Sequence, residues 1–488
     1  MVKTGGLSKQ RSFSLPPGSY LRGAVLFLVT VFLVLLLLQI QALRRPSQLS
    51  PPSSAWDVLR HWEQALPGCC GDCARKLESA TSRLRDAVTF LPLKNATLED
   101  TAGEGTTWFM SSLNDTYEGD EGAQYLRFPS SASGGKLLCL AGNHTRDGTK
   151  NSYATAWPDA LPSGAALLPG LTFVFDNYYG YDNIWHGLGA VMPFFGWHRN
   201  RGCPLPARWV LYYRGEVRAA MAYWVRKLAE VVLGQDLVVE AFEREGASRP
   251  TCFEEAVVFR HNEGVMSVRR KMEVYDMLRC KARAFCNVTS SSSSEEGGKT
   301  TPVVRMTLLL RTGARSFRNE SAVVDIFRTA CGRFDGCRFA VTWATKLETF
   351  CDQVRALSGT DLLVSAHGAQ LTNMFFMDRN SSVMELFPKG WLGLAGPGQY
   401  VYHWLATSSG MRHRGAWRDP NGVACPFPGE DLRCFTQYYK DQQVGHDEAH
   451  FSNWTAAVLG QAREEKLGRV ATGGGRPRRG QPSGCPCG

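Results

Sequence analysis

The sequence lacks the signatures of several common functional classes. No histidine pair at zinc-finger spacing accompanies the cysteine pairs, which argues against a zinc module. No Gly-x-Ser-x-Gly motif and no convincing carboxylate pair occur, which argues against a hydrolase. Residues 51–460 carry no net charge, because the formal charge of +10 arises from residues 1–50 and 461–488. A folded nucleic-acid-binding surface needs excess basic charge, so nucleic acid is not an expected partner.

Charge is also absent from a long apolar run near the N-terminus. Residues 23–43 form 21 uncharged positions, enough for a helix to cross the roughly 30 Å core of a bilayer. Basic residues without any acid precede the run, which places residues 1–22 in the cytoplasm. A cleaved signal peptide is the alternative, but its apolar core would be shorter. We therefore expect a single-pass type II protein of the Golgi or ER membrane, with its remaining chain in the lumen.

The cysteines and glycosylation sequons agree with a lumenal location. Most of the 15 cysteines lie in pairs or close clusters, which is typical of disulfide-bonded proteins of an oxidising compartment. All seven Asn-x-Ser/Thr sequons follow the apolar run. Several disulfides are therefore predicted, although the pairing of the cysteines cannot be read from their spacing.

Apolar runs and helical periodicity alternate along two stretches of the chain. In the first, strands are predicted at 171–176, 208–213, 236–240 and 252–259, with helices at 184–195 and 216–233. A low-complexity linker follows at 290–302. In the second, strands at 303–311, 337–343, 361–366 and 382–387 alternate with helices at 321–330, 347–357 and 369–376. This alternation predicts an α/β protein with two Rossmann-like domains facing a cleft.

The chain thus divides into seven predicted segments. They are a cytoplasmic tail at 1–22, a transmembrane signal anchor at 23–43, a stem and irregular N-terminal region at 44–165, an N-terminal Rossmann-like domain at 166–300, a C-terminal Rossmann-like domain at 301–410, a C-terminal extension at 411–470, and a disordered tail at 471–488.

The segment SAHGAQLTNMFFM at residues 365–377 predicts an anion-binding turn. An apolar strand ends there, His367, Gly368 and Ala369 form a tight turn, and a helix follows whose start includes Thr372 and Asn373. Small residues let a ligand approach the main chain, and the unpaired amides of a helix start favour an anion such as a diphosphate. An ordinary strand-turn-helix with a packing glycine is the alternative interpretation.

Two further segments add charged groups to the same region. Arg311 lies at the carboxyl end of the strand 303–311, with Arg315 shortly after it. One guanidinium group can bind two phosphate oxygens at once. The carboxyl ends of parallel strands line one edge, so these arginines are expected to face the site of His367. Glu385 lies within the apolar strand 382–387. It accepts hydrogen bonds from ribose hydroxyls, or it pairs with a nearby arginine, and both interpretations stay open.

These motifs, in this order and spacing, resemble the catalytic region of glycosyltransferase family 61. The resemblance rests on Arg311, Arg315 and Asn319, on residues 365–377, and on VMELFP at 383–388. It extends more weakly to Asn183-Ile184-Trp185-His186 upstream. The resemblance implies a GT-B fold and an inverting transfer of xylose, arabinose or GlcNAc from a UDP-sugar. It also implies a glycan, polysaccharide or glycoprotein acceptor, with residues 166–300 as the acceptor domain and residues 301–410 as the nucleotide-sugar domain.

The sequence departs from the pattern of that family at two places. An acidic residue often follows the upstream histidine of the family, whereas Gly187 follows His186 here. Inversion needs a base for the proton of the acceptor hydroxyl, and we expect His186, with Asp182 next and Glu263 also available. The second departure is Gln370, where the family usually has glycine. Both departures suit the alternative hypothesis of a catalytically inactive, membrane-tethered protein that binds a sugar nucleotide or glycan.

The sequence contains no Asp-x-Asp triplet, the pattern that would suggest a metal-assisted leaving group. We therefore expect no metal and no permanently bound cofactor. Arg311, Arg315 and the main chain of residues 367–372 would stabilise the departing diphosphate in place of an ion.

Overall fold

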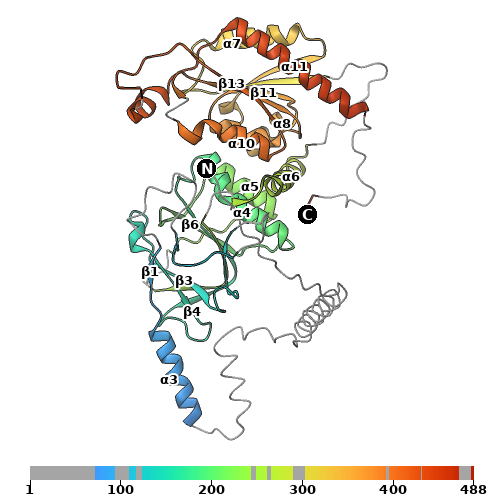
Figure 1. Ribbon diagram of the computed structural model, residues 1–488. Helices are drawn as coiled ribbons and strands as arrows, with labels where there is room; N and C mark the ends of the chain where they lie inside the picture. Colours follow the sequence, from blue (N-terminus) through green and yellow to red (C-terminus); the bar gives the residue numbers. More distant parts are fainter. Residues whose placement is uncertain are drawn as a thin grey trace, which may run out of the picture. The chain divides into compact units, whose positions relative to one another are not determined.

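The computed structural model describes residues 72–93, 109–116, 124–242, 249–260, 265–288, 303–391, 395–429, 431–471 and 485–487 (Figure 1). The predicted tail at 1–22, the predicted anchor at 23–43 and the predicted linker at 290–302 lie outside them. Within the described ranges no helix is both long and apolar enough to span a bilayer.

The first sheet combines a parallel centre with antiparallel flanks. Its strands are β1 (Leu91–Pro92), β2 (Leu126–Phe128), β3 (Leu137–Ala141), β4 (Ser152–Ala156), β5 (Ala166–Asn177), β6 (Arg208–Tyr213), β7 (Glu216–Arg218) and β8 (Thr251–Phe259). They follow the order β1-β4-β3-β8-β5-β6-β7, and β2 also pairs with β8. Strand β5 runs parallel to both β6 and β8. The helices of this half are α3 (Asp72–Asp86), α4 (Ile184–Asn200), α5 (Tyr223–Leu233) and α6 (Val268–Phe285).

Two predicted elements of this half are wrong. The helix predicted at 216–233 begins only at Tyr223, because Arg214 and Gly215 both have positive φ and form a tight hairpin turn. The residues after that turn pair back onto β6 as β7. The strand predicted at 236–240 is a single bridge between Val239 and Trp209, too short for a strand.

The second sheet is entirely parallel. Its strands are β9 (Val304–Leu310), β10 (Cys337–Trp343), β11 (Leu362–Ala366), β12 (Ser382–Phe387) and β13 (Arg412–Arg418), in the order β10-β9-β11-β12-β13. Along the chain, β10 is added on one side of β9, and β11, β12 and β13 are then added on its other side. The gap between the ends of β9 and β11 is therefore a topological switch point, where open α/β sheets bind ligands.

Helices cover both faces of this second sheet (Figure 1). They are α7 (Glu320–Gly332), α8 (Phe350–Ser358), the 3-10 helix η5 (Ala369–Phe376), α10 (Val401–Ser408) and α11 (Glu448–Ala471). Alternate residues of β9 face opposite sides: Leu308 packs with α7 and α11, while Leu309 joins the cluster that contains α8, η5 and α10. That cluster also contains apolar residues of α4, α5 and α6, so one continuous core connects the helices of the two sheets.

Three features of the second half differ from the pattern read in the sequence. The helix at 369–376 is a 3-10 helix rather than an α-helix. Past residue 410, where the apolar pattern weakens, the structure contains strand β13 and helix α11. Strand β13 pairs only with β12 and has a single buried residue, Trp417, so it lacks the apolar run of a central strand.

Six disulfides join described cysteines, in agreement with the clustered cysteine pattern. The pairs are Cys139–Cys252, Cys203–Cys487, Cys280–Cys485, Cys286–Cys351, Cys331–Cys337 and Cys425–Cys434. Two of the bonds attach the C-terminal Cys-Pro-Cys segment to α6 and to the loop after α4.

Candidate functional site

Arg311 and His367 meet at the switch point of the second sheet. Arg311 follows β9 directly, and His367 follows β11. Nη1 of Arg311 donates to the main-chain carbonyl of His367 at 3.0 Å and to Oε1 of Gln370 at 3.3 Å. The two elements therefore lie together at one edge of the sheet, as predicted. Their part in binding a diphosphate stays a prediction.

Arg315 adds a second guanidinium beside Arg311. Its main chain is left-handed, with φ of 59°, and its guanidinium lies 5.4 Å from the ring centre of Trp391. Burial, with the neighbouring charge of Arg315, lowers the pKa of Arg311 to about 10, and burial also lowers the pKa of Arg315. Within the described part of the chain, Nε of each arginine is buried without a hydrogen-bond partner. Two adjacent cations with unused donors form a suitable site for an anion.

Gly368 makes room for this arrangement. A Cβ at this position would lie 1.9 Å from Nη1 of Arg311 and 2.5 Å from Oε1 of Gln370. A side chain here would therefore displace the guanidinium. The main-chain amide of His367 donates to Leu386 at 2.8 Å and is not available to a ligand.

The ring of His367 is enclosed by aromatic side chains and by Glu385. The ring centres of Phe387, Trp391 and Tyr402 lie 4.6, 4.3 and 5.1 Å away. Nδ1 of His367 bonds Oε1 of Glu385 at 2.5 Å, and Nε2 of His413 bonds the other carboxylate oxygen at 2.8 Å. These contacts hold the imidazole in one orientation at the turn.

Glu385 has neither of the roles predicted from the sequence. Its side chain has no exposed surface, so it cannot meet a ribose, and its partners are two histidines rather than an arginine. Burial acts to raise its pKa, but the hydrogen bonds from His367 and His413 outweigh burial and hold the pKa below the usual value. Glu385 is therefore an ionised group behind the site, and it orients His367.

Thr372 and Asn373 are packed within the core rather than displayed on the surface. Thr372 is fully buried, and Asn373 is 4% exposed. Oδ1 of Asn373 accepts a hydrogen bond from Nε1 of Trp224 on α5 at 2.9 Å. This bond connects η5 to a helix of the first sheet. The parts of Thr372 and Asn373 in binding a ligand stay predictions.

The start of α4 brings the two predicted bases to the same region. Asn183 caps this helix, its Oδ1 accepting from the amide of Trp185 at 2.9 Å. Trp185 contacts Tyr402, with 5.7 Å between ring centres, and Tyr402 contacts His367. His186 stacks on Tyr179 at 4.2 Å, and burial, with Lys440 nearby, lowers its pKa to about 4. Asp182 is exposed. Glu263, the third possible base, lies outside the described residues.

A cavity of about 530 Å³ lies between the start of α4 and the turn after β11. Its lining includes Asp182 and Asn183 from the first half, and Ala369, Gln370 and Asn373 from the second. This volume is in the usual range for small-molecule sites. His186 does not line the cavity, so Asp182 is the predicted base that faces it.

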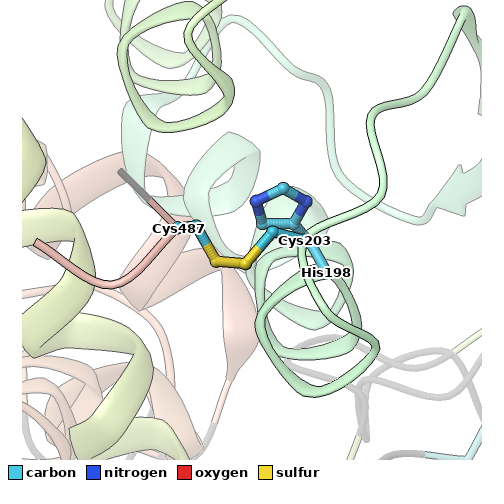
Figure 2. Close-up of side chains that lie close together, drawn as sticks. All are labelled: His198, Cys203 and Cys487. Atoms are coloured by element: carbon cyan, nitrogen blue, oxygen red, sulfur yellow. A yellow bond between two sulfur atoms is a disulfide. The ribbon is translucent and has the colours of Figure 1, made fainter.

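Among the described residues, one group of potential metal ligands lies close together. His198, Cys203 and Cys487 form it, and Figure 2 shows the histidine beside the Cys203–Cys487 disulfide. Disulfide sulfurs are not the thiolates that bind metals. Nδ1 of His198 bonds the main-chain carbonyl of Pro204 at 2.8 Å. This group is therefore part of the link between α4 and the C-terminal segment.

Sequence reasoning missed several residues that surround the arginines. Tyr402 and Trp391 enclose His367, His413 supports Glu385, and the charges of Lys440 and Asp441 act on His186 and on the two arginines respectively. These residues lie up to 130 positions from Arg311 along the chain, in segments without a recognisable motif. Glu385 was the one residue in the sequence that indicated such partners, because an ionised side chain in an apolar strand requires them.

The chain is similar to known glycosyltransferases over part of its length. Residues 168–384 match the family model described as Glycosyltransferase 61. Protein O-linked-mannose β-1,4-N-acetylglucosaminyltransferase 2 of Mus musculus is 42% identical over 81 residues, which cover 16% of this chain and 13% of that protein. The protein of the same name from Danio rerio is 37% identical over 108 residues, which cover 21% of this chain and 18% of that protein. The chain matches less than a fifth of the length of these relatives.

One solved structure shows a looser similarity. The bacterial iron-containing dodecameric glycosyltransferase TibC of enterotoxigenic E. coli is 11% identical, with 74% of this chain and 95% of that chain covered at a TM-score of 0.25. A TM-score this low supports no conclusion about the fold.

Proposed function

We propose that this chain, whose residues 168–384 match the glycosyltransferase 61 family model, transfers a sugar from a UDP-sugar to a hydroxyl of a glycan or glycoprotein. One observation carries the proposal. Arg311 and Arg315 lie together at the switch point with buried, unpartnered Nε groups, and Arg311 also contacts the turn at His367. A donor diphosphate supplies the anionic oxygens that such a pair of cations binds.

The donor and acceptor follow from the relatives. Among xylose, arabinose and GlcNAc, we favour GlcNAc, because the curated relatives are N-acetylglucosaminyltransferases by name. Their name also points to a protein-linked sugar as the acceptor. We further propose that the two sheets belong to the two domains of a GT-B fold, and that the cavity between α4 and η5 lies in the cleft between those domains. The support is the α/β character of both sheets and the position of the cavity.

The proposed reaction inverts the anomeric carbon. The acceptor oxygen bonds to that carbon, and the bond from the carbon to the diphosphate oxygen breaks. Its electron pair stays on the diphosphate, where Arg311 and Arg315 stabilise the added negative charge. The hydroxyl proton passes to a base. We propose Asp182 for this role, because it faces the cavity, with His186 as the alternative.

The proposed location is the Golgi or ER membrane, with type II topology. The apolar run at 23–43 lies outside the described residues, and the support for this location comes from that run, the sequons beyond it and the disulfides. We also propose that transfer needs no metal, because the guanidinium pair supplies the positive charge. Loss of transfer in EDTA and its return with manganese would contradict this part of the proposal.

Replacing Arg311 tests the site directly. Arg311→Ala removes a charge-assisted contact that strengthens as the leaving group departs, so we expect turnover of UDP-GlcNAc to fall about 100-fold or more. The measurement is donor hydrolysis and transfer by the full chain. Arg328→Ala is the matched control, because Arg328 is a half-exposed residue of α7 paired with Asp325. Equal kinetics of Arg311→Ala and the wild type would refute the assignment.

The same assay separates the enzyme from an inactive binding protein. An enzyme both binds UDP and turns over the donor. A protein that is stabilised by UDP but neither transfers nor hydrolyses any UDP-sugar would support the inactive, membrane-tethered alternative.

A further inference from the structure

The cavity beside the turn after β11 differs chemically from the arginine site next to it. Of the described residues that line it, none is Lys, Arg or His. The polar lining consists of four amide side chains and one carboxylate, contributed by Asp182, Asn183, Gln353, Gln370 and Asn373. The described lining therefore supplies no side-chain cation to balance a phosphate. Amides both donate and accept hydrogen bonds, as sugar hydroxyls do.

Gln370 marks the border between the two environments. Its Oε1 accepts from Nη1 of Arg311 at 3.3 Å, while its Nε2 donates to the carbonyl of Ala366 at 2.7 Å. The same side chain lines the cavity. The cavity therefore begins where the cationic site ends. In a nucleotide sugar the anomeric carbon is bonded to the diphosphate, so the sugar must lie directly beside the group that Arg311 binds.

The side of the cavity formed by α8 and the segment before it has both polar and aliphatic groups. Nε2 of Gln353 donates to the carbonyl of Leu347 at 3.1 Å, and no described residue bonds its Oε1. The aliphatic side chains of Ala344, Leu347 and Leu309 complete this side. An acetamido group matches such a surface, because it has an N–H donor for the free amide oxygen and a methyl group for the aliphatic side chains.

We propose that this cavity binds the transferred sugar, and that Gln353 and Leu347 select a donor with a 2-acetamido group. This inference rests on the proposed function. It assigns the diphosphate and the sugar to two separate sets of residues. Gln353 is a specificity-determining residue in this scheme. Its side-chain hydrogen bond is to Leu347, whereas Arg311 bonds His367.

A comparison of three ligands tests the proposal on the full chain. The ligands are UDP, UDP-GlcNAc and UDP-glucose, and the last two differ only in the acetamido group. We expect the wild type to prefer UDP-GlcNAc in both calorimetric binding and donor hydrolysis. Gln353→Ala should lower that preference about 3- to 10-fold, the effect of one lost hydrogen bond, and leave UDP affinity unchanged. Gln235→Ala is the matched control, since its Nε2 also donates to a main-chain carbonyl, that of Pro206, away from the cavity.

A second variant covers the case in which Gln353→Ala does not fold. Leu347→Phe fills space in the cavity, so it should weaken UDP-GlcNAc more than UDP-glucose and leave UDP unaffected. A folded variant that still binds UDP and keeps the wild-type preference for UDP-GlcNAc overturns this inference but not the proposed function. A wild type that binds UDP without preferring UDP-GlcNAc does the same. A wild type that binds none of the three ligands overturns the proposed function, and the inference with it.

Discussion

The surroundings of Glu385 hold its side chain in the ionised form. Both of its carboxylate oxygens are bonded by histidines, and its pKa lies below the usual value. Its ionised form therefore stabilises the fold above the unfolded pKa, and that stability is lost as the pH falls through the folded pKa. Glu385→Gln should lower the free energy of unfolding at pH 7 on the order of 3 kcal/mol, because it breaks a buried charged network.

Urea unfolding at pH 7 and at pH 3 measures this effect. The difference between the wild type and Glu385→Gln should shrink at the lower pH, because the unfolded wild type there takes up a proton that the folded carboxylate, with its lowered pKa, binds less readily. Asp325→Asn is the control, since Asp325 pairs with Arg328 at the surface, and such an exposed pair is worth less than about 1 kcal/mol. A difference of the same size at both pH values would contradict an ionised Glu385.

His186 should make the stability of the protein depend on pH in a second window. Its folded pKa is about 4, below the usual 6.5, because burial disfavours the charged ring. Between these values the unfolded state binds more protons than the folded state, so stability falls as the pH falls from 6.5 to 4. His186→Phe keeps an aromatic ring against Tyr179 and removes the titration.

Thermal unfolding across pH 4 to 7 tests this expectation. The wild type should lose stability more steeply than His186→Phe as the pH falls. His450→Phe, at an exposed position of α11, should follow the wild type. Parallel profiles of the wild type and His186→Phe would mean that the histidine titrates normally in the folded protein.

At the scale of elements, the turn between β11 and η5 determines where Arg311 lies. A Cβ at position 368 would overlap Nη1 of Arg311, whereas a Cβ at Gly359 would lie 3.8 Å from its nearest neighbour, an ordinary contact. Gly368→Ala should therefore lower donor turnover at least about 10-fold by moving the guanidinium. Gly359→Ala should leave donor turnover unchanged. Full activity of Gly368→Ala would show that the position of Arg311 at the turn is not needed.

The other end of η5 is held by α6, a helix that the sequence pattern did not reveal. Nε of Arg279 donates to the carbonyl of Phe375 at 2.8 Å, and Nη2 of Arg283 donates to that of Phe376 at 2.6 Å. These bonds satisfy carbonyls at the end of η5 that its own backbone leaves free. Helix α6 of the first half therefore positions the helix that begins at the site.

At the scale of the whole molecule, disulfides connect the two halves. Cys286–Cys351 joins α6 to α8 across 65 residues, while Cys331–Cys337 closes only 6 residues. The loss of chain entropy in the unfolded state grows with loop length, so removing the first pair by double alanine substitution should cost about 4 kcal/mol and removing the second about 2 kcal/mol. Chemical denaturation of both variants measures the difference. A larger loss from the shorter loop would contradict this account.

The sequence by itself determined the alternation of strands and helices, the expectation of disulfides, and the two segments that carry Arg311 and His367. Each depends on residues close together in the chain: apolar runs for strands, and small or charged residues directly after them for ligand sites. The shared edge of Arg311 and His367 also followed, since parallel strands place their carboxyl ends at one edge. The polar edge strand β13 and the helix α6 were not predicted, because neither has a clear apolar run or a strong hydrophobic period.

Only the tertiary structure decided which groups surround the arginines. Glu385 meets His413 because β13 adds beside β12, a pairing between residues 28 positions apart that no local pattern encodes. Gln370 separates the cationic site from the cavity, and Asp182 faces that cavity, because α4 packs against the turn after β11. Such contacts depend on how distant elements pack around a shared core. Sequence periodicity describes each element separately and does not contain that packing.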